Sequence, residues 1–142
     1  MTVVRQGDLF DPKCPTRMLL DRIGTKWTSM AIKALSEAAP DELRFSALRR
    51  RMPGISQKML SVTLQNLTRD GLVARRVEPS VPPGVYYALT DLGLSLEVPL
   101  GSLRAWAEEH MHAIELNNRR ADSLDQPGRP ASRVAADDQG SV

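Results

Sequence analysis

The residues best suited to a binding role are the cations of one short segment. Residues 44–76 contain eight Lys or Arg side chains and one acid, Asp70, whereas the whole chain of 142 residues carries a formal net charge of +2. Cations that gather in one patch attract phosphate groups, and this local charge matters more than the total. An Arg-rich segment on its own is more often a solvated surface, so the patch needs a structural context before it indicates a partner.

That context is the pattern of apolar residues, which predicts a helix-turn-helix followed by a β-hairpin. The predicted helix, turn, helix and two strands span residues 45–52, 53–55, 56–69, 72–78 and 85–89. Ser56 is a suitable N-cap for the second helix, and Gly71 fits a cap at its C-terminal end. A helix pair of this kind with a basic hairpin beside it fits a DNA groove and carries the charge to bind there.

The residues on either side of this motif are expected to be mostly helical. The spacing predicts helices over residues 15–23 and 26–38, a very short strand over residues 43–45 and a long final helix that Thr90 caps. Pro99 lies inside the final helix and should kink it or divide it in two. An apolar stripe follows this helix: Leu92, Leu96, Leu100, Leu103, Trp106, His110 and Ile114.

Length and composition predict one domain over residues 13–120, mainly α with a small β-hairpin. Residues 1–12 are expected to form a flexible arm. Residues 121–142 are expected to be a disordered tail, because the segment from Ser123 onward has almost no large apolar side chains to offset its ordering entropy.

Several function classes are not expected. No run of about 18 apolar residues and no secretory start are present, so we expect no membrane association, and a single cysteine suits a reducing cytoplasm. The chain has no Gly-rich phosphate loop, no Gly-x-Ser-x-Gly and no His-Glu-x-x-His, so we expect neither an enzyme nor a cofactor. His110 and His112 point to different sides of a helix, which makes them a poor metal chelate.

Six stretches resemble the HxlR family of bacterial transcription regulators, winged helix-turn-helix proteins related to the MarR type. In chain order they are Cys14-Pro15, residues 23–28, residues 44–50, residues 53–60, residues 70–73 and residues 87–93. The resemblance implies a homodimer on double-stranded DNA. Whether it represses or activates depends on where its operator lies relative to a promoter, and repression by occlusion is the default hypothesis. The resemblance also implies that the first and last helices form the dimer interface, that one recognition helix per subunit enters the major groove and that the hairpin wings touch the flanking backbone.

The expected DNA contacts are of two kinds. Base reading is expected from the recognition helix through Gln57, Lys58, Ser61, Val62 and Gln65, with Val62 free to touch a thymine methyl group. Phosphate contacts are expected from Arg49, Arg50, Arg75 and Arg76, and Arg44, Ser46 and Ser56 complete the predicted surface. Family members often carry an Arg in the wing where this chain has Gly84, so base reading is expected to rest on the helix.

Cys14 precedes Pro15 at a helix start, where unpaired amides favour a thiolate. Several members of the family use a cysteine at this position to sense oxidants or electrophiles, which implies a redox-responsive regulator. The alternatives are a quiet, half-buried thiol, a regulator that answers a small molecule without redox sensing, and a winged-helix module for protein–protein assembly. The net +7 of residues 44–76 argues against the last, because a protein-binding face needs fewer phosphate-seeking side chains.

Overall fold

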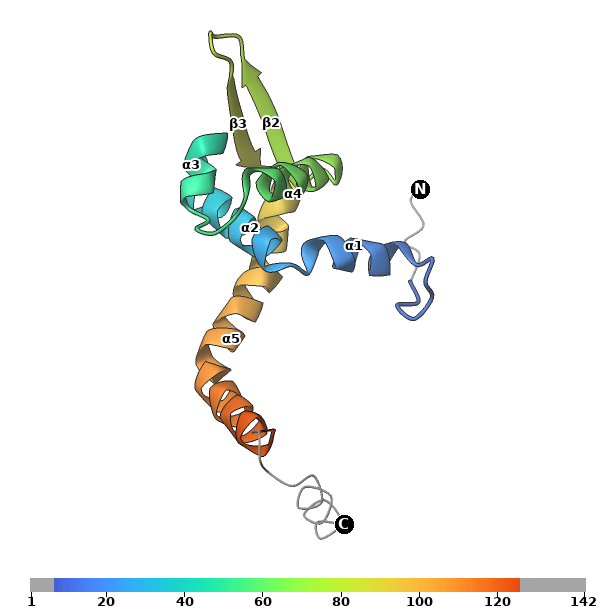
Figure 1. Ribbon diagram of the computed structural model, residues 1–142. Helices are drawn as coiled ribbons and strands as arrows, with labels where there is room; N and C mark the ends of the chain where they lie inside the picture. The colour runs from blue at the N-terminus through green and yellow to red at the C-terminus, as the bar shows by residue number, and fades with distance from the viewer. Residues whose placement is uncertain (1–6, 126–142) are drawn as a thin grey trace. The chain divides into compact units, whose positions relative to one another are not determined.

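The structure is a computed structural model that describes residues 7–125. These residues form five helices and three strands (Figure 1), in the order α1 (Pro15–Ile23), α2 (Lys26–Ala38), β1 (Leu43–Arg44), α3 (Phe45–Arg50), α4 (Gln57–Arg69), β2 (Val73–Glu78), β3 (Gly84–Leu89) and α5 (Asp91–Leu124). The predicted fold class, mainly α with a small β-hairpin, is confirmed. The described residues form two compact units, and the division falls within α5 after Gly101.

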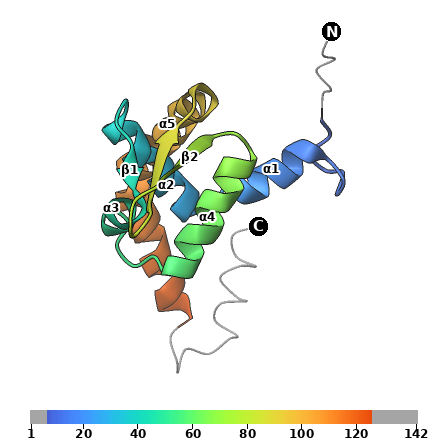
Figure 2. The ribbon, with the colours of Figure 1, turned by 90° about the horizontal axis from the view of Figure 1, so that it is seen from above.

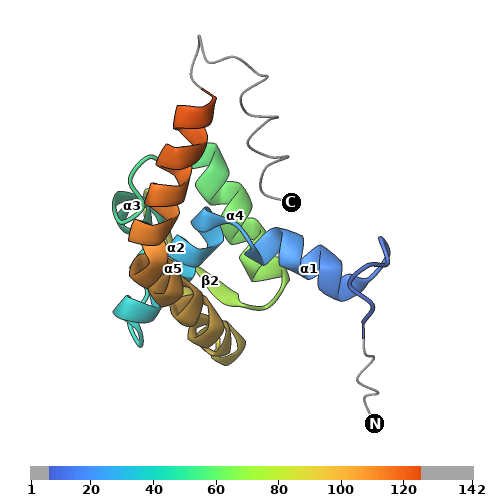
Figure 3. The ribbon, with the colours of Figure 1, turned by 90° about the horizontal axis from the view of Figure 1, so that it is seen from below.

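The core of the first unit is built around α2. The apolar side of α2, with Ile32 and Leu35 fully buried, packs against Leu48 of α3 and Leu60 of α4. Figure 2 shows α4 with α2 behind it, and Figure 3 shows the same two helices together from the opposite side. This packing holds the helix-turn-helix, formed by α3 and α4, against the body of the unit.

The sheet has the strand order β1-β3-β2, and all its pairs are antiparallel. Within the hairpin, Arg75 lies opposite Tyr87 and Arg76 lies opposite Tyr86. Because side chains alternate along a strand, these two pairs lie on opposite faces of the sheet. The register therefore separates two neighbouring arginines that the sequence places side by side.

One predicted helix boundary is wrong, and one of the two outcomes predicted for Pro99 is excluded. The first helix of the motif ends at Arg50, not at residue 52, because Met52 precedes Pro53 and a residue before proline is disfavoured in the helical conformation. The final helix runs unbroken from Asp91 to Leu124. Pro99 thus does not divide the helix, since it removes only one backbone hydrogen bond of a helix of 34 residues, and a kink at Pro99 stays a prediction.

The predicted terminal segments are tested only in part. Residues 121–124 belong to α5, although the tail was expected to begin at residue 121. The rest of the predicted tail from residue 126, and residues 1–6 of the predicted arm, lie outside the described residues.

The start of α5 approaches the end of α4 very closely. Thr90 caps α5 as predicted: its hydroxyl accepts a hydrogen bond from the Gly93 amide and donates one to the Gly71 carbonyl. A Cβ atom on Gly93 would overlap the carbonyl oxygen of Leu72. Only glycine fits here without a backbone shift.

We therefore expect Gly93→Ala to lower the free energy of unfolding by roughly 1–3 kcal/mol, the usual cost of overpacking, although alanine is the better helix former. Chemical denaturation measures the change. The exposed Ser95 of the same helix provides the control, and Ser95→Ala should stay within about 0.5 kcal/mol of the parent. A Gly93→Ala protein as stable as the parent would show that the close approach is not a constraint.

Candidate nucleic-acid interface

The orientation of α4 is fixed by its ends and by its buried face. The hydroxyl of Ser56 accepts a hydrogen bond from the Met59 amide at 3.0 Å, which confirms the predicted N-cap. Gly71 has a left-handed φ of 76°, and the Gly71 and Leu72 amides donate to carbonyls of the last turn, which confirms the predicted C-terminal cap. Three leucines form the buried face: Leu60, Leu64 and Leu67.

The opposite face of α4 presents an exposed row of side chains. Its members are spaced at i, i+4, i+7 and i+11, so they project on the same side: Lys58, Val62, Gln65 and Arg69. The exposure predicted for Lys58, Val62 and Gln65 is confirmed. Arg69 is not among the predicted DNA contacts, although its helical spacing from Lys58 places it on the same face of α4. We call these four residues the outer row.

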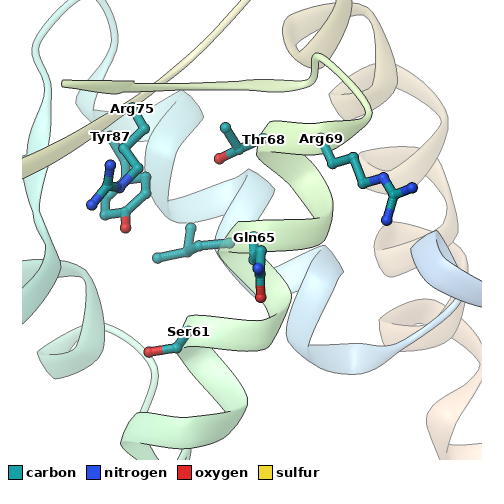
Figure 4. A pocket seen from close by; sticks show the side chains of 7 residues that line it. Ser61, Gln65, Thr68, Arg69, Arg75 and Tyr87 are labelled. Carbon is teal, nitrogen blue, oxygen red and sulfur yellow. The ribbon is translucent and has the colours of Figure 1, made fainter.

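A groove of about 580 Å³ runs beside the outer row, between α4 and the base of the hairpin. Figure 4 shows Ser61, Gln65 and Thr68 on α4 with Arg75 and Tyr87 on the strands, and shows Arg69 extending to the far side. An adjoining hollow of about 450 Å³ shares Ser61 and Tyr87 with the groove. Three more of the predicted DNA contact residues line this hollow: Arg44, Ser46 and Gln57.

The two arginines of β2 have different environments. Arg75 lines the groove, and its side chain has no hydrogen bond or ion pair within residues 7–125. Arg76 lies on the other face, where its Nε is 2.9 Å and 3.0 Å from the two carboxylate oxygens of Glu42. These hydrogen bonds raise the pKa of Arg76 above its ordinary value. The guanidinium groups of Arg76 and Arg44 lie 4.6 Å and 6.0 Å from the centre of the Tyr86 ring.

Other predicted contact residues also have partners within the chain. The Ser56 hydroxyl serves as the cap of α4, and Arg49 Nε lies 3.5 Å from the Ile55 carbonyl oxygen in the turn of the motif. Arg50 is exposed. The structure thus brings together the predicted residues of α4 with Arg44, Ser46 and Arg75, while Ser56 and Arg76 are occupied elsewhere.

The single acid of the basic segment is paired. Asp70, next to the C-terminal end of α4, receives two hydrogen bonds of 2.9 Å from Arg22 of α1. These bonds raise the pKa of Arg22 above its ordinary value. A cation from outside the segment therefore balances the one carboxylate that would oppose an anionic partner.

Cys14 occupies the N-cap position of α1, but its side chain is only 4% exposed. Its sulfur lies close to Gly7, since a Cβ atom added there would be 2.8 Å from it. Gly7, which lies ahead of α1, is thus one of the residues against the thiol. Over residues 7–125 no helix is long and apolar enough to span a membrane, and no group of three potential metal ligands occurs.

Comparison with known proteins agrees with this geometry. Residues 22–115 match the family model described as HxlR-like helix-turn-helix. The chain is 39% identical over 111 residues to YtfH of Escherichia coli strain K12, which is named as an HTH-type transcriptional regulator; the match covers 78% of this chain and 86% of that protein.

Solved structures give the same result. Structural similarity to ytfH from Salmonella typhimurium, described as a transcriptional regulator, has a TM-score of 0.74 at 36% identity and covers 80% of this chain and 99% of that one. The redox regulator HypR in its oxidized form has a TM-score of 0.58 at 38% identity, covering 68% and 96%. The fold, the family match and these relatives together show that the chain belongs to the HxlR-like helix-turn-helix family of transcriptional regulators.

Proposed function

We propose that the protein is a homodimeric, sequence-specific regulator that binds duplex DNA and represses by occupying its operator. One observation carries this proposal: the outer row of α4 and the groove beside it form a continuous surface, largely of polar and cationic side chains, to which Lys58, Gln65 and Arg75 contribute without an ion pair in the described part of the chain. Phosphates and base edges are the ligands that such side chains bind.

The dimensions of α4 suit the major groove. Its 13 residues extend over about 20 Å, at ~1.5 Å per residue, and a major groove is ~12 Å wide. Lys58 and Gln65 would then reach base edges, and Val62 would contact a thymine methyl group. Arg75 would bind the backbone, which positions α4 without reading sequence.

Unburied apolar surface supports the dimer. In the C-terminal unit, Leu103 and Trp106 of α5 are 62% and 53% exposed, and no residue of α1 is buried. A second copy of the chain would cover such faces. A two-fold dimer would present two copies of α4 to half-sites about 34 Å apart.

Oxidant control through Cys14 is a further part of the proposal. The similarity to a redox regulator supports it. Because the thiol is buried and Gly7 lies against it, the reaction requires the thiol to become exposed first. Cys14 is the only cysteine, so the product is a Cys14–Cys14 disulfide between subunits, a mixed disulfide or an adduct.

The test of sequence-specific binding compares Lys58→Ala with Arg75→Ala. The probes are the duplex that the parent protein enriches from a random pool and a scrambled duplex, and fluorescence anisotropy gives both affinities. Lys58→Ala should lose about 1–3 kcal/mol on the enriched duplex and discriminate less between the two. Arg75→Ala should weaken both about equally and reduce the salt slope by ~0.9. Identical effects of the two variants would refute this division of roles.

Glu42 competes with phosphate for Arg76, so Glu42→Gln should release a cation. Affinity for the enriched and scrambled duplexes should rise together, and the salt dependence should steepen by up to ~0.9 in slope. Asp41→Asn is the matched control, since it removes one charge from the neighbouring position and Asp41 has no ion pair within the described chain. Equal gains in both variants would indicate a general charge effect and not the release of Arg76.

Cys14→Ser should abolish any release of the enriched duplex by diamide, because a hydroxyl cannot form a disulfide. The parent should release its DNA slowly, since the thiol is covered. Anisotropy followed over time after addition of diamide measures both proteins. Release at the same rate in Cys14→Ser would exclude this residue from the response.

A further inference from the structure

The groove between α4 and the hairpin contains a tyrosine whose ring is buried but whose hydroxyl is open to the groove. Tyr87 is 7% exposed, yet its hydroxyl has no hydrogen-bond partner anywhere in residues 7–125. The hydroxyl is not among the buried side-chain atoms that lack a partner in the described residues, so water reaches it in the groove, and a ligand with an acceptor oxygen could replace that water. The ring is held by the core, with Phe45 at a centroid distance of 6.4 Å, so the hydroxyl is fixed in place.

The surroundings of this hydroxyl favour an anion. Figure 4 shows it pointing towards Ser61, with the side chain of Arg75 beside the ring. Arg75 and Tyr87 are paired in the sheet, and Ser61 lines both hollows together with Tyr87. The Ser61 and Arg75 side chains also have no internal hydrogen bond in the described part of the chain, and no Asp or Glu lines either hollow.

We propose that Tyr87, Ser61 and Arg75 bind one backbone phosphate of the duplex, with the Tyr87 hydroxyl donating a hydrogen bond to a phosphate oxygen. Two neutral donors and one guanidinium match the acceptor oxygens and the charge of a phosphodiester. The site adjoins the outer row through Gln65, so a phosphate held there would set the depth and angle at which α4 enters the groove. This inference rests on the proposed function and adds Tyr87 to it as a positioning residue.

The test uses Tyr87→Phe, which removes only the hydroxyl. Because that hydroxyl has no partner in the free protein, the melting temperature should not fall. Affinity for the enriched and the scrambled duplex should fall together by roughly 10- to 150-fold, as for one hydrogen bond to a charged group. The salt slope should stay unchanged, since no cation is lost. Tyr86→Phe is the matched control: its hydroxyl belongs to the opposite face, and phenylalanine keeps the ring against which Arg44 and Arg76 lie, so binding should equal that of the parent.

Methylphosphonate substitution then identifies the ligand. One linkage at a time in the enriched duplex is replaced by the neutral analogue, and affinity is measured for the parent and for Tyr87→Phe. We expect one linkage in each half-site whose replacement weakens the parent but has little further effect on Tyr87→Phe, while penalties at other linkages persist.

Three results would overturn the inference. They are unchanged binding of Tyr87→Phe, a loss of affinity accompanied by a lower melting temperature, and a methylphosphonate profile identical to that of the parent. In each of these cases the parent still binds DNA, so the proposed function stands. A parent protein that binds no duplex would overturn the proposed function and this inference together.

Discussion

The burial of one face of α4 is the constraint on which the rest of the surface depends. Leu60, Leu64 and Leu67 can reach the core around α2 in only one rotation of the helix. That rotation places Lys58 and Val62 outward and turns Ser61 towards the hairpin. Helical geometry then fixes the directions of the other side chains of α4, because residues three and four apart share a face. Stability and recognition are therefore set by the same packing.

The positive charge that this surface presents to a partner is not given by the number of its cations, because some of them interact within the chain. Eight basic residues lie within residues 44–76, but Arg76 is engaged by Glu42, and Arg49 approaches a carbonyl group of the motif's turn. Conversely, the ion pair with Arg22 of α1 neutralises the negative charge of Asp70. The charge that a polyanion would meet is concentrated near α4 and Arg75, beside the unpaired hydroxyls of the groove. Ion pairs and hydrogen bonds within the chain thus leave only part of the basic segment to contact a polyanion.

Local features of the interface could be predicted from the sequence. The apolar spacing predicted which side of α4 is buried, and Ser56 and Gly71 predicted its ends. The different environments of Arg75 and Arg76 could not be predicted, because a shift of one residue in strand register exchanges the two faces of the sheet. The five-residue loop over residues 79–83 does not set that register from sequence alone. The role of Tyr87 depends on the same register. The Arg22–Asp70 pair joins residues 48 positions apart, and local patterns do not encode such a contact.

The central claim is that this surface recognises particular DNA sequences. The most direct measurement is fluorescence anisotropy of the parent protein on duplex fragments from upstream of its own coding region and of the neighbouring gene, against a scrambled duplex, at two salt concentrations. The account predicts tight binding to one native fragment, weaker binding to the scramble, and a steep loss of affinity for both as salt rises. Equal affinity for all duplexes, or none for any, would contradict it.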